Sequence, residues 1–284
     1  MPDTEAITIR FLTREDVGGA MRLKAVARWN QTEEDWRRLL RLDPRGCFAA
    51  TAGGRIVATT TTTAYGRELA WIGMVLVDPE FRRRGIATTL VRAALARLAG
   101  ANVATIKLDA TPEGASVYEG LGFEAELRVE RWSGVASSGQ GSAATPVSDP
   151  SQVFALDRDA FGADRSRLLT SLFEDACVRP LVSVAADGRP RGYALARAGA
   201  EAFYVGPVVV ADEQSRAELL DGMLSQLAGR RVFVDLNTTV EGGAEELAAR
   251  GFVRQRELIR MRRGEKSGAG TSASVFAIAG PEVG

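Results

Sequence analysis

A basic turn that contains glycine lies between an apolar strand pattern and a helix pattern, and it has the composition of a phosphate site. Residues 75–79 read Val-Leu-Val-Asp-Pro, and Arg82-Arg83-Arg84-Gly85 follow shortly after them. Backbone amides in the first turn of a helix have no intrahelical partner and lie at the positive end of the helix dipole. Gly85 would let an anion approach the backbone. The segment predicts a pyrophosphate site, although the same residues also suit a surface helix that begins with arginines.

The chain has no histidine, which excludes several mechanisms together. A Ser-His-Asp triad, an H-E-x-x-H zinc site and a histidine-ligated haem all need an imidazole. General-base catalysis must therefore depend on a carboxylate or on water. Cys47 and Cys177 fall in different halves of the chain, so neither a disulfide framework nor a zinc site is expected. Cys47 lies in an apolar strand pattern and is predicted to be a buried small hydrophobe.

The net charge and the hydropathy of the chain limit the kinds of partner that we expect it to bind. Lysines plus arginines number 36, as do aspartates plus glutamates, so no overall field favours nucleic acid or an anionic membrane. No apolar run approaches the roughly 20 residues that span a bilayer. Residues 1–5 are acidic where a secretory signal would be basic. We expect a cytoplasmic protein without nucleic-acid or membrane partners and without a metal site.

The chain contains an internal repeat. Leu121-Gly122-Phe123 matches Arg250-Gly251-Phe252, and Leu98-Ala99-Gly100 matches Leu227-Ala228-Gly229 at the same separation. A small-residue stretch with the character of a flexible linker lies between the copies. The repeat predicts one domain over residues 1–133, a linker over 134–149 and a second domain over 150–284.

Each copy shows a mixed α/β pattern of strand, helices, a meander of strands, a helix, a strand, a short helix and a last strand. In the first copy we expect strands at 7–11, 47–52, 55–64, 69–77, 103–110 and 123–132, and helices at 13–27, 32–40, 85–98 and 114–120.

The spacing Arg82-x-x-Gly85-x-Ala87 after residues 75–79 resembles the coenzyme A signature of the GNAT acetyltransferase superfamily, and the resemblance covers most of residues 7–132. It implies two tandem domains, each a mostly antiparallel, splayed sheet flanked by helices. It also implies that backbone amides near the helix start bind pyrophosphate, while the backbone of the preceding strand pairs with pantetheine. The coenzyme-binding residues that it implies are Val75, Leu76, Val77, Arg82, Arg83, Arg84, Gly85, Ile86, Ala87 and Thr88.

Residues 115–123 look like the second landmark of this superfamily, a short helix with a tyrosine near the coenzyme sulfur. The resemblance implies that Tyr118 is the general acid that protonates the departing thiolate, a role open to a positioned phenol. The alternative is that Tyr118 only packs the short helix.

The general base is harder to identify. Many relatives place a carboxylate on the central strand, but residues 69–74 contain none. Asp109 is the leading candidate, because it ends the neighbouring strand where a ligand crevice opens in splayed α/β sheets. It is equally consistent with capping the turn at Thr111-Pro112.

Three residues are candidate acceptor contacts. Trp29 and Asn30 lie between the two early helices, where this fold commonly builds its acceptor wall, and Trp71 lies on the central strand. Either tryptophan could instead belong to the core. Acidic residues at 33–35 would suit a cationic amine, although they also favour the start of a helix.

The second copy lacks both landmarks. Residues 207–221 contain no glycine and several acids, and Leu247 stands where the repeat places Tyr118. We expect this half to pack on the first and to close the acceptor pocket; a regulatory ligand site is the rival interpretation. Residues 274–280 are expected to dock as a strand.

These observations predict an N-acyltransferase that moves acetyl from acetyl-coenzyme A, its co-substrate, to a primary amine by direct attack. A small-molecule amine is favoured over a protein acceptor. A non-catalytic protein that responds to acyl-coenzyme A is the alternative, and the sequence leaves the oligomeric state open.

Overall fold

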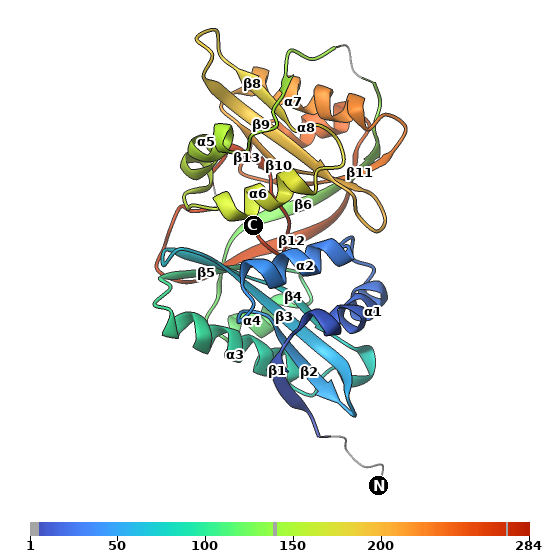
Figure 1. Cartoon of the computed structure of the whole chain (residues 1–284), viewed down its shortest axis with the longest axis vertical. Helices are drawn as coiled ribbons and strands as arrows, with labels where there is room; N and C mark the ends of the chain where they lie inside the picture. Colours follow the sequence, from blue (N-terminus) through green and yellow to red (C-terminus); the bar gives the residue numbers. More distant parts are fainter. Residues whose placement is uncertain (1–5, 139–140, 271) are drawn as a thin grey trace.

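The computed structural model describes residues 6–138, 141–270 and 272–284 and shows one continuous mixed sheet with helices packed on it (Figure 1). The first half of the chain contains a short 3-10 helix at Arg14–Asp16, another at Pro79–Phe81, and four α-helices. Its elements are β1 (Thr8–Phe11), α1 (Val17–Ala27), α2 (Glu33–Leu42), β2 (Phe48–Ala52), β3 (Arg55–Tyr65), β4 (Leu69–Val77), α3 (Ile86–Gly100), β5 (Thr105–Ala110), α4 (Ala115–Glu119) and β6 (Glu124–Val135).

The second half repeats this order and adds a strand at its end. Its elements are β7 (Thr145–Pro146), α5 (Ser151–Phe161), α6 (Ser166–Glu174), β8 (Leu181–Val184), β9 (Pro190–Arg197), β10 (Phe203–Val210), α7 (Glu213–Gln226), β11 (Arg231–Asn237), α8 (Gly243–Ala249), β12 (Val253–Gly264) and β13 (Val275–Ala277). The mixed α/β class is confirmed, and so is the docking of the chain end as a strand. Among the described residues, no helix is both long and apolar enough to cross a bilayer.

Local signals account for several element boundaries. Thr32 caps α2, because its backbone N–H donates to the Asp35 carboxylate over 2.7 Å while its hydroxyl accepts from the Asp35 amide over 3.4 Å. The β2–β3 hairpin turns at Gly53 and Gly54, both of which have positive φ. Cys47 is fully buried as expected, and burial raises the pKa of its thiol to about 12.

The two halves exchange their last strands. The sheet order runs β4-β5-β12-β6-β11, so β12 from the second half lies against β5, and β6 from the first half lies against β11. Residues assigned to the second domain by chain order therefore complete the sheet of the first. The two copies are separable in sequence but share one sheet in space (Figure 1).

Parts of the segment that the sequence suggests as a linker are ordered. β6 continues to Val135, β7 begins at Thr145, and both Ala136 and Val147 are buried. Residues 139 and 140 lie outside the described residues. Ala136 and Val147 anchor this segment, although most of its other described side chains are exposed, so its small-residue composition alone does not show that the whole segment is a free linker.

The sheet opens between β4 and β5. These parallel strands pair only over Leu69–Trp71 and residues 105–107. Beyond that point the register of β4 against β3 shifts, and Met74 adopts a left-handed φ of 51°. A β-bulge of this kind bends a strand and increases its twist. The strands therefore diverge, and the space between their carboxyl ends becomes available to a ligand.

Candidate functional site

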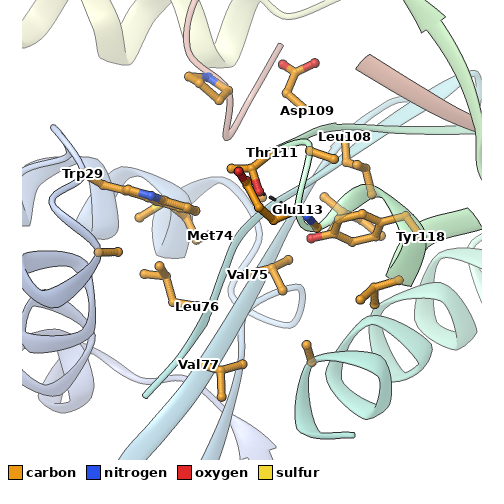
Figure 2. Close-up of a pocket in the computed structure, with 18 of the residues that line it drawn as sticks. Trp29, Met74, Val75, Leu76, Val77, Leu108, Asp109, Thr111, Glu113 and Tyr118 are labelled. Carbon is orange, nitrogen blue, oxygen red and sulfur yellow. Dashed lines mark hydrogen bonds between the residues drawn. The ribbon is translucent and has the colours of Figure 1, made fainter. Parts of the chain in front are cut away.

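A cavity of about 730 Å³ opens where β4 and β5 diverge (Figure 2). Its walls come from the end of β4, the start of α3, the end of β5 and the short helix α4, together with β12 and the C-terminal tail of the second half. A volume of this size is within the range of small-molecule and cofactor sites. The cavity therefore joins the segments that carry the sequence motifs to residues that lie far from them in the chain.

One end of the cavity is the N-terminus of α3. The first bond of the helix runs from the Thr89 amide to the Gly85 carbonyl over 3.0 Å, so the amides of residues 86–88 have no intrahelical partner. Gly85 precedes the helix with a φ of 74°, and no atom lies within 4 Å of the position that a Cβ would occupy. This open helix end is suited to a phosphate group.

Most of the predicted coenzyme residues line the cavity, namely Val75, Leu76, Val77, Arg82, Arg83, Gly85, Ile86, Ala87 and Thr88. Arg84 does not. Its guanidinium lies 4.9 Å above the Phe81 ring and donates to the Glu80 carbonyl over 3.0 Å. Arg84 therefore stabilises the turn from outside the cavity.

The β4 backbone has an edge that faces this space. Its other edge pairs with β3, where Leu76 opposes Thr59 and Val77 opposes Ala58. The second half shows what such an edge can bind. There β10 is bulged between Val205 and Val208 in its pairing with β9, and β13 pairs with β10 at Val208 and Val209. The repeat aligns these two residues with Val75 and Leu76, so the corresponding edge of β4 is suited to an extended ligand.

Tyr118 reaches the middle of the cavity from α4, with its hydroxyl directed toward the side on which Trp29 lies (Figure 2). Its ring packs edge-on against Phe123, with 6.0 Å between centroids. The hydroxyl has no hydrogen-bond partner within residues 6–138, 141–270 and 272–284, so it is available to a ligand. Burial raises the pKa of Tyr118 to about 12, and the phenol is therefore protonated at neutral pH.

Asp109 lines the cavity, but its carboxylate is already bound by another side chain. Both of its oxygens accept from Arg260, over 2.8 and 2.9 Å, and the two side chains are almost fully buried. Burial raises the pKa of Asp109, and the Arg260 guanidinium opposes that rise. This geometry favours a role in tying β5 to β12 over transfer of an amine proton.

The three predicted acceptor contacts have different positions. Trp29 lines the cavity. Asn30 is buried and joins the halves, because its amide donates to the Ala202 carbonyl over 3.0 Å and accepts from the Ala202 amide over 3.1 Å. Trp71 is fully buried, and its indole N–H donates to the Pro281 carbonyl over 3.1 Å. Only Trp29 is therefore in a position to touch a bound acceptor.

Gln31, Glu113, Arg256 and Glu282 also line the cavity, and the sequence did not single them out for it. Gln31 Nε2 donates to Glu282 Oε2 over 2.8 Å, and Arg197 donates to Glu282 Oε1 over 3.1 Å. Burial raises the pKa of Glu282, and Arg197 opposes that rise. Local sequence carries no signal for Gln31, Arg256 and Glu282 as a group, because they come from an interhelical turn, the exchanged strand and the tail, whereas Glu113 lies in the loop between β5 and α4.

The corresponding region of the second half is closed. Asp212 caps α7, and its carboxylate accepts from the Ser215 amide over 2.7 Å. Leu247 occupies the place of Tyr118: the Phe252 amide donates to the Leu247 carbonyl as the Phe123 amide does to that of Tyr118, over 3.0 Å in both cases. At these two positions the second half therefore presents neither an uncapped helix end nor a phenol.

Comparisons with known proteins agree with this geometry. Residues 20–123 match the Acetyltransferase (GNAT) family, and residues 153–277 match an Acetyltransferase (GNAT) domain. The uncharacterized N-acetyltransferase YitH of Bacillus subtilis is 30% identical over 215 residues, covering 74% of this chain and 75% of YitH.

Two solved structures are similar over almost the whole chain. A putative acetyltransferase from Pyrococcus horikoshii superposes with a TM-score of 0.84 at 23% identity, covering 98% of this chain and 96% of that one. A tandem GNAT protein from the clavulanic acid biosynthesis pathway superposes with a TM-score of 0.62 at 16% identity, covering 92% and 100%. At these identities the two structures establish the tandem fold and leave the substrate to be argued from the cavity.

Proposed function

The chain belongs to the GNAT acetyltransferase family and is an acyltransferase; from that premise we propose that it transfers acetyl from acetyl-coenzyme A to a primary amine within the cavity of its N-terminal half. The observation that carries this proposal is the position of Tyr118. Its hydroxyl, which has no partner among the described residues, shares one cavity with the open N-terminus of α3 and the divergent edge of β4. A coenzyme whose pyrophosphate binds at α3 and whose arm follows β4 would bring its thioester toward this phenol.

In this proposal, one set of groups binds the coenzyme and Tyr118 transfers the proton. The open amides at α3 and the β4 edge hold and orient the coenzyme, so that the amine nitrogen can attack the thioester carbonyl directly. As the C–N bond forms and the C–S bond breaks, Tyr118 gives its proton to the departing sulfur and later recovers one from solvent. The nitrogen loses its surplus proton to a carboxylate or to water. The products are an N-acetyl amine and free coenzyme A, with no acyl group on the enzyme.

Calorimetric titration of acetyl-coenzyme A into the wild-type protein and a Gly85→Glu variant tests the coenzyme site. A glutamate would bring negative charge to the proposed phosphate position, and we expect it to weaken binding by at least about 100-fold. Gly188→Glu is the matched control. Gly188 also has a positive φ of 83° and open space around its Cβ position, but it lies in the β8–β9 turn and does not line the cavity.

One site per chain that is lost in Gly85→Glu and retained in Gly188→Glu would support the proposed coenzyme site. Equal affinity of the two variants would contradict it. Release of free coenzyme A in the presence of a panel of amines tests turnover separately. Binding without turnover of any amine would favour the alternative of a non-catalytic acyl-coenzyme A sensor.

A further inference from the structure

The second half of the chain builds the end of the cavity that lies away from the α3 helix start. Arg256 and Leu258 reach it from the exchanged strand β12, and Pro281 and Glu282 reach it from the C-terminal tail. The tail lies directly on β4: a Cβ at Gly73 would be 2.6 Å from the Glu282 Cα. This end therefore depends on the contact between the halves.

Arg256 is a partly buried cation without a paired carboxylate. Its Nε is buried and has no hydrogen-bond partner among the described residues, and no ion pair of its guanidinium is seen in them. Asp235, the buried acid that acts most strongly on Arg256, is already occupied, because both of its oxygens accept from Arg131 over 2.7 Å. Burial and the neighbouring Arg131 guanidinium lower the pKa of Arg256. An anionic group in the cavity would relieve both effects.

Gln31 and Glu282 offer acceptor oxygens at the same end. Gln31 is only 7% exposed, and its Oε1 has no partner in the described part of the chain. The Nε2 group must face Glu282, to which it donates, so the free atom is the carbonyl oxygen. A buried acceptor without a donor is costly. An amine or ammonium group would supply the missing donor and would be attracted by the Glu282 carboxylate.

The sheet register brings the cation and the acceptor oxygens into one neighbourhood. Arg256 lies opposite Arg131 in the β12–β6 pairing. Arg131 in turn lines a second, small cavity of about 10 Å³ together with Gln31 and Pro281, both of which also line the main cavity. In the sheet, β5 lies between β12, which carries Arg256, and β4, on which the tail lies.

We propose that the acceptor is a small primary amine that also carries a carboxylate, as amino acids do. Arg256 binds the carboxylate, while Gln31 Oε1 and Glu282 bind the amine. This inference rests on the proposed transfer reaction and adds the chemical class of its acceptor. Gln31 Oε1 and Arg256 Nε are the buried side-chain atoms that line this cavity and have no partner among the described residues, and a small molecule with an amine and a carboxylate would supply a partner for each.

A competition assay tests the acceptor class. The full-length protein is given acetyl-coenzyme A and equal concentrations of a common amino acid and the amine that it yields on decarboxylation, such as β-alanine with ethylamine or lysine with cadaverine. Mass spectrometry measures the ratio of the two N-acetyl products. We expect the carboxylate-bearing member to dominate at least one pair by about 10-fold or more.

The same competition assay on the Arg256→Gln variant tests whether Arg256 binds the carboxylate of the acceptor. The preference should fall by at least about 10-fold, because the variant keeps hydrogen-bond donors but loses the charge. Arg254→Gln is the matched control: Arg254 lies on the same strand but is exposed, pairs with Glu130 and does not line the cavity. Acetyl-coenzyme A titration of both variants confirms that each is folded.

The two proposals fail in different ways. Acetylation of decarboxylated amines at least as fast as of their amino acids, or a preference that Arg256→Gln leaves intact, would overturn the acceptor class and leave the acetyl-transfer reaction standing. Failure to acetylate any member of any pair would overturn the acceptor class as well, and the coenzyme titration would show whether the coenzyme site survives.

Discussion

Each half of this molecule has a crevice between two central parallel strands, and the two crevices are filled differently. In each half a parallel strand pair separates after a short run of pairing, between β4 and β5 in the first and between β10 and β11 in the second. In the first half the gap is a cavity. In the second half β13 enters the gap and pairs with both strands.

The helix N-termini beside the two crevices also differ, because one is uncapped and the other is capped by a side chain. The α3 helix starts after Gly85 with no side-chain cap, whereas Asp212 caps α7 and places a carboxylate at its amides. The second half therefore satisfies internally the groups that the first half leaves to a ligand. In the second half the added strand β13 pairs the backbone groups that the opening of the sheet would leave free.

Removal of the Phe276 side chain should have the largest effect on the closed crevice. Phe276 lies on β13 and is fully buried. Phe276→Ala should lower the free energy of unfolding by about 3–5 kcal/mol, as large-to-small core substitutions do. Urea denaturation measures the change. A loss below about 1 kcal/mol would mean that β13 is not an integral part of the second half.

Tyr118→Phe tests the open crevice at its chemical centre. Loss of the general acid should lower kcat by about 100-fold or more. The free energy of unfolding and the affinity for acetyl-coenzyme A should change little, because the hydroxyl has no partner among the described residues. Steady-state kinetics and calorimetry separate these quantities. Full turnover by the variant would leave Tyr118 as a packing residue only.

The Asp212→Ala variant tests how much the side-chain cap contributes to the difference between the N-termini of α3 and α7. Loss of the cap should lower the free energy of unfolding by about 1 kcal/mol. It should create no second coenzyme site, since β13 still fills the crevice. Urea denaturation gives the stability, and calorimetric stoichiometry gives the number of sites. Two sites per chain in the variant would show that the cap alone closes the second half.

The pH dependence of kcat should show the smallest effect. A general acid works in its protonated form, so activity is lost as pH rises through its pKa. Because burial raises the pKa of Tyr118 to about 12, ionisation of this phenol should cause no decline in kcat up to about pH 10, the ordinary value for tyrosine. A fall in kcat centred near pH 10 that disappears in Tyr118→Phe would contradict this assignment.

Local sequence was sufficient where the determinants of a feature are adjacent in the chain. Strand β4, the turn at Gly85 and helix α3 follow one another directly, and their order alone places free amides beside a strand edge. The capping box at Thr32 and the hairpin at Gly53 were readable for the same reason. The repeat also showed that the second half lacks the glycine turn and the tyrosine of the first.

The end of the cavity that we propose for the acceptor could not be predicted from local sequence. Asn30 and Trp71 were plausible contacts by position, but hydrogen bonds to the second half and the tail hold them outside the cavity. Gln31, Arg256 and Glu282 come together only because β12 crosses into the first half of the sheet and the tail lies on Gly73.

The sequence by itself therefore determined the family, the tandem plan and the uncapped helix end beside β4, since these depend on short-range backbone geometry and on residues close in the chain. Only the tertiary structure decided which groups line the end of the cavity that we propose for the acceptor. Strand exchange and tail docking are long-range pairings, and they bury charges whose partners no local pattern records.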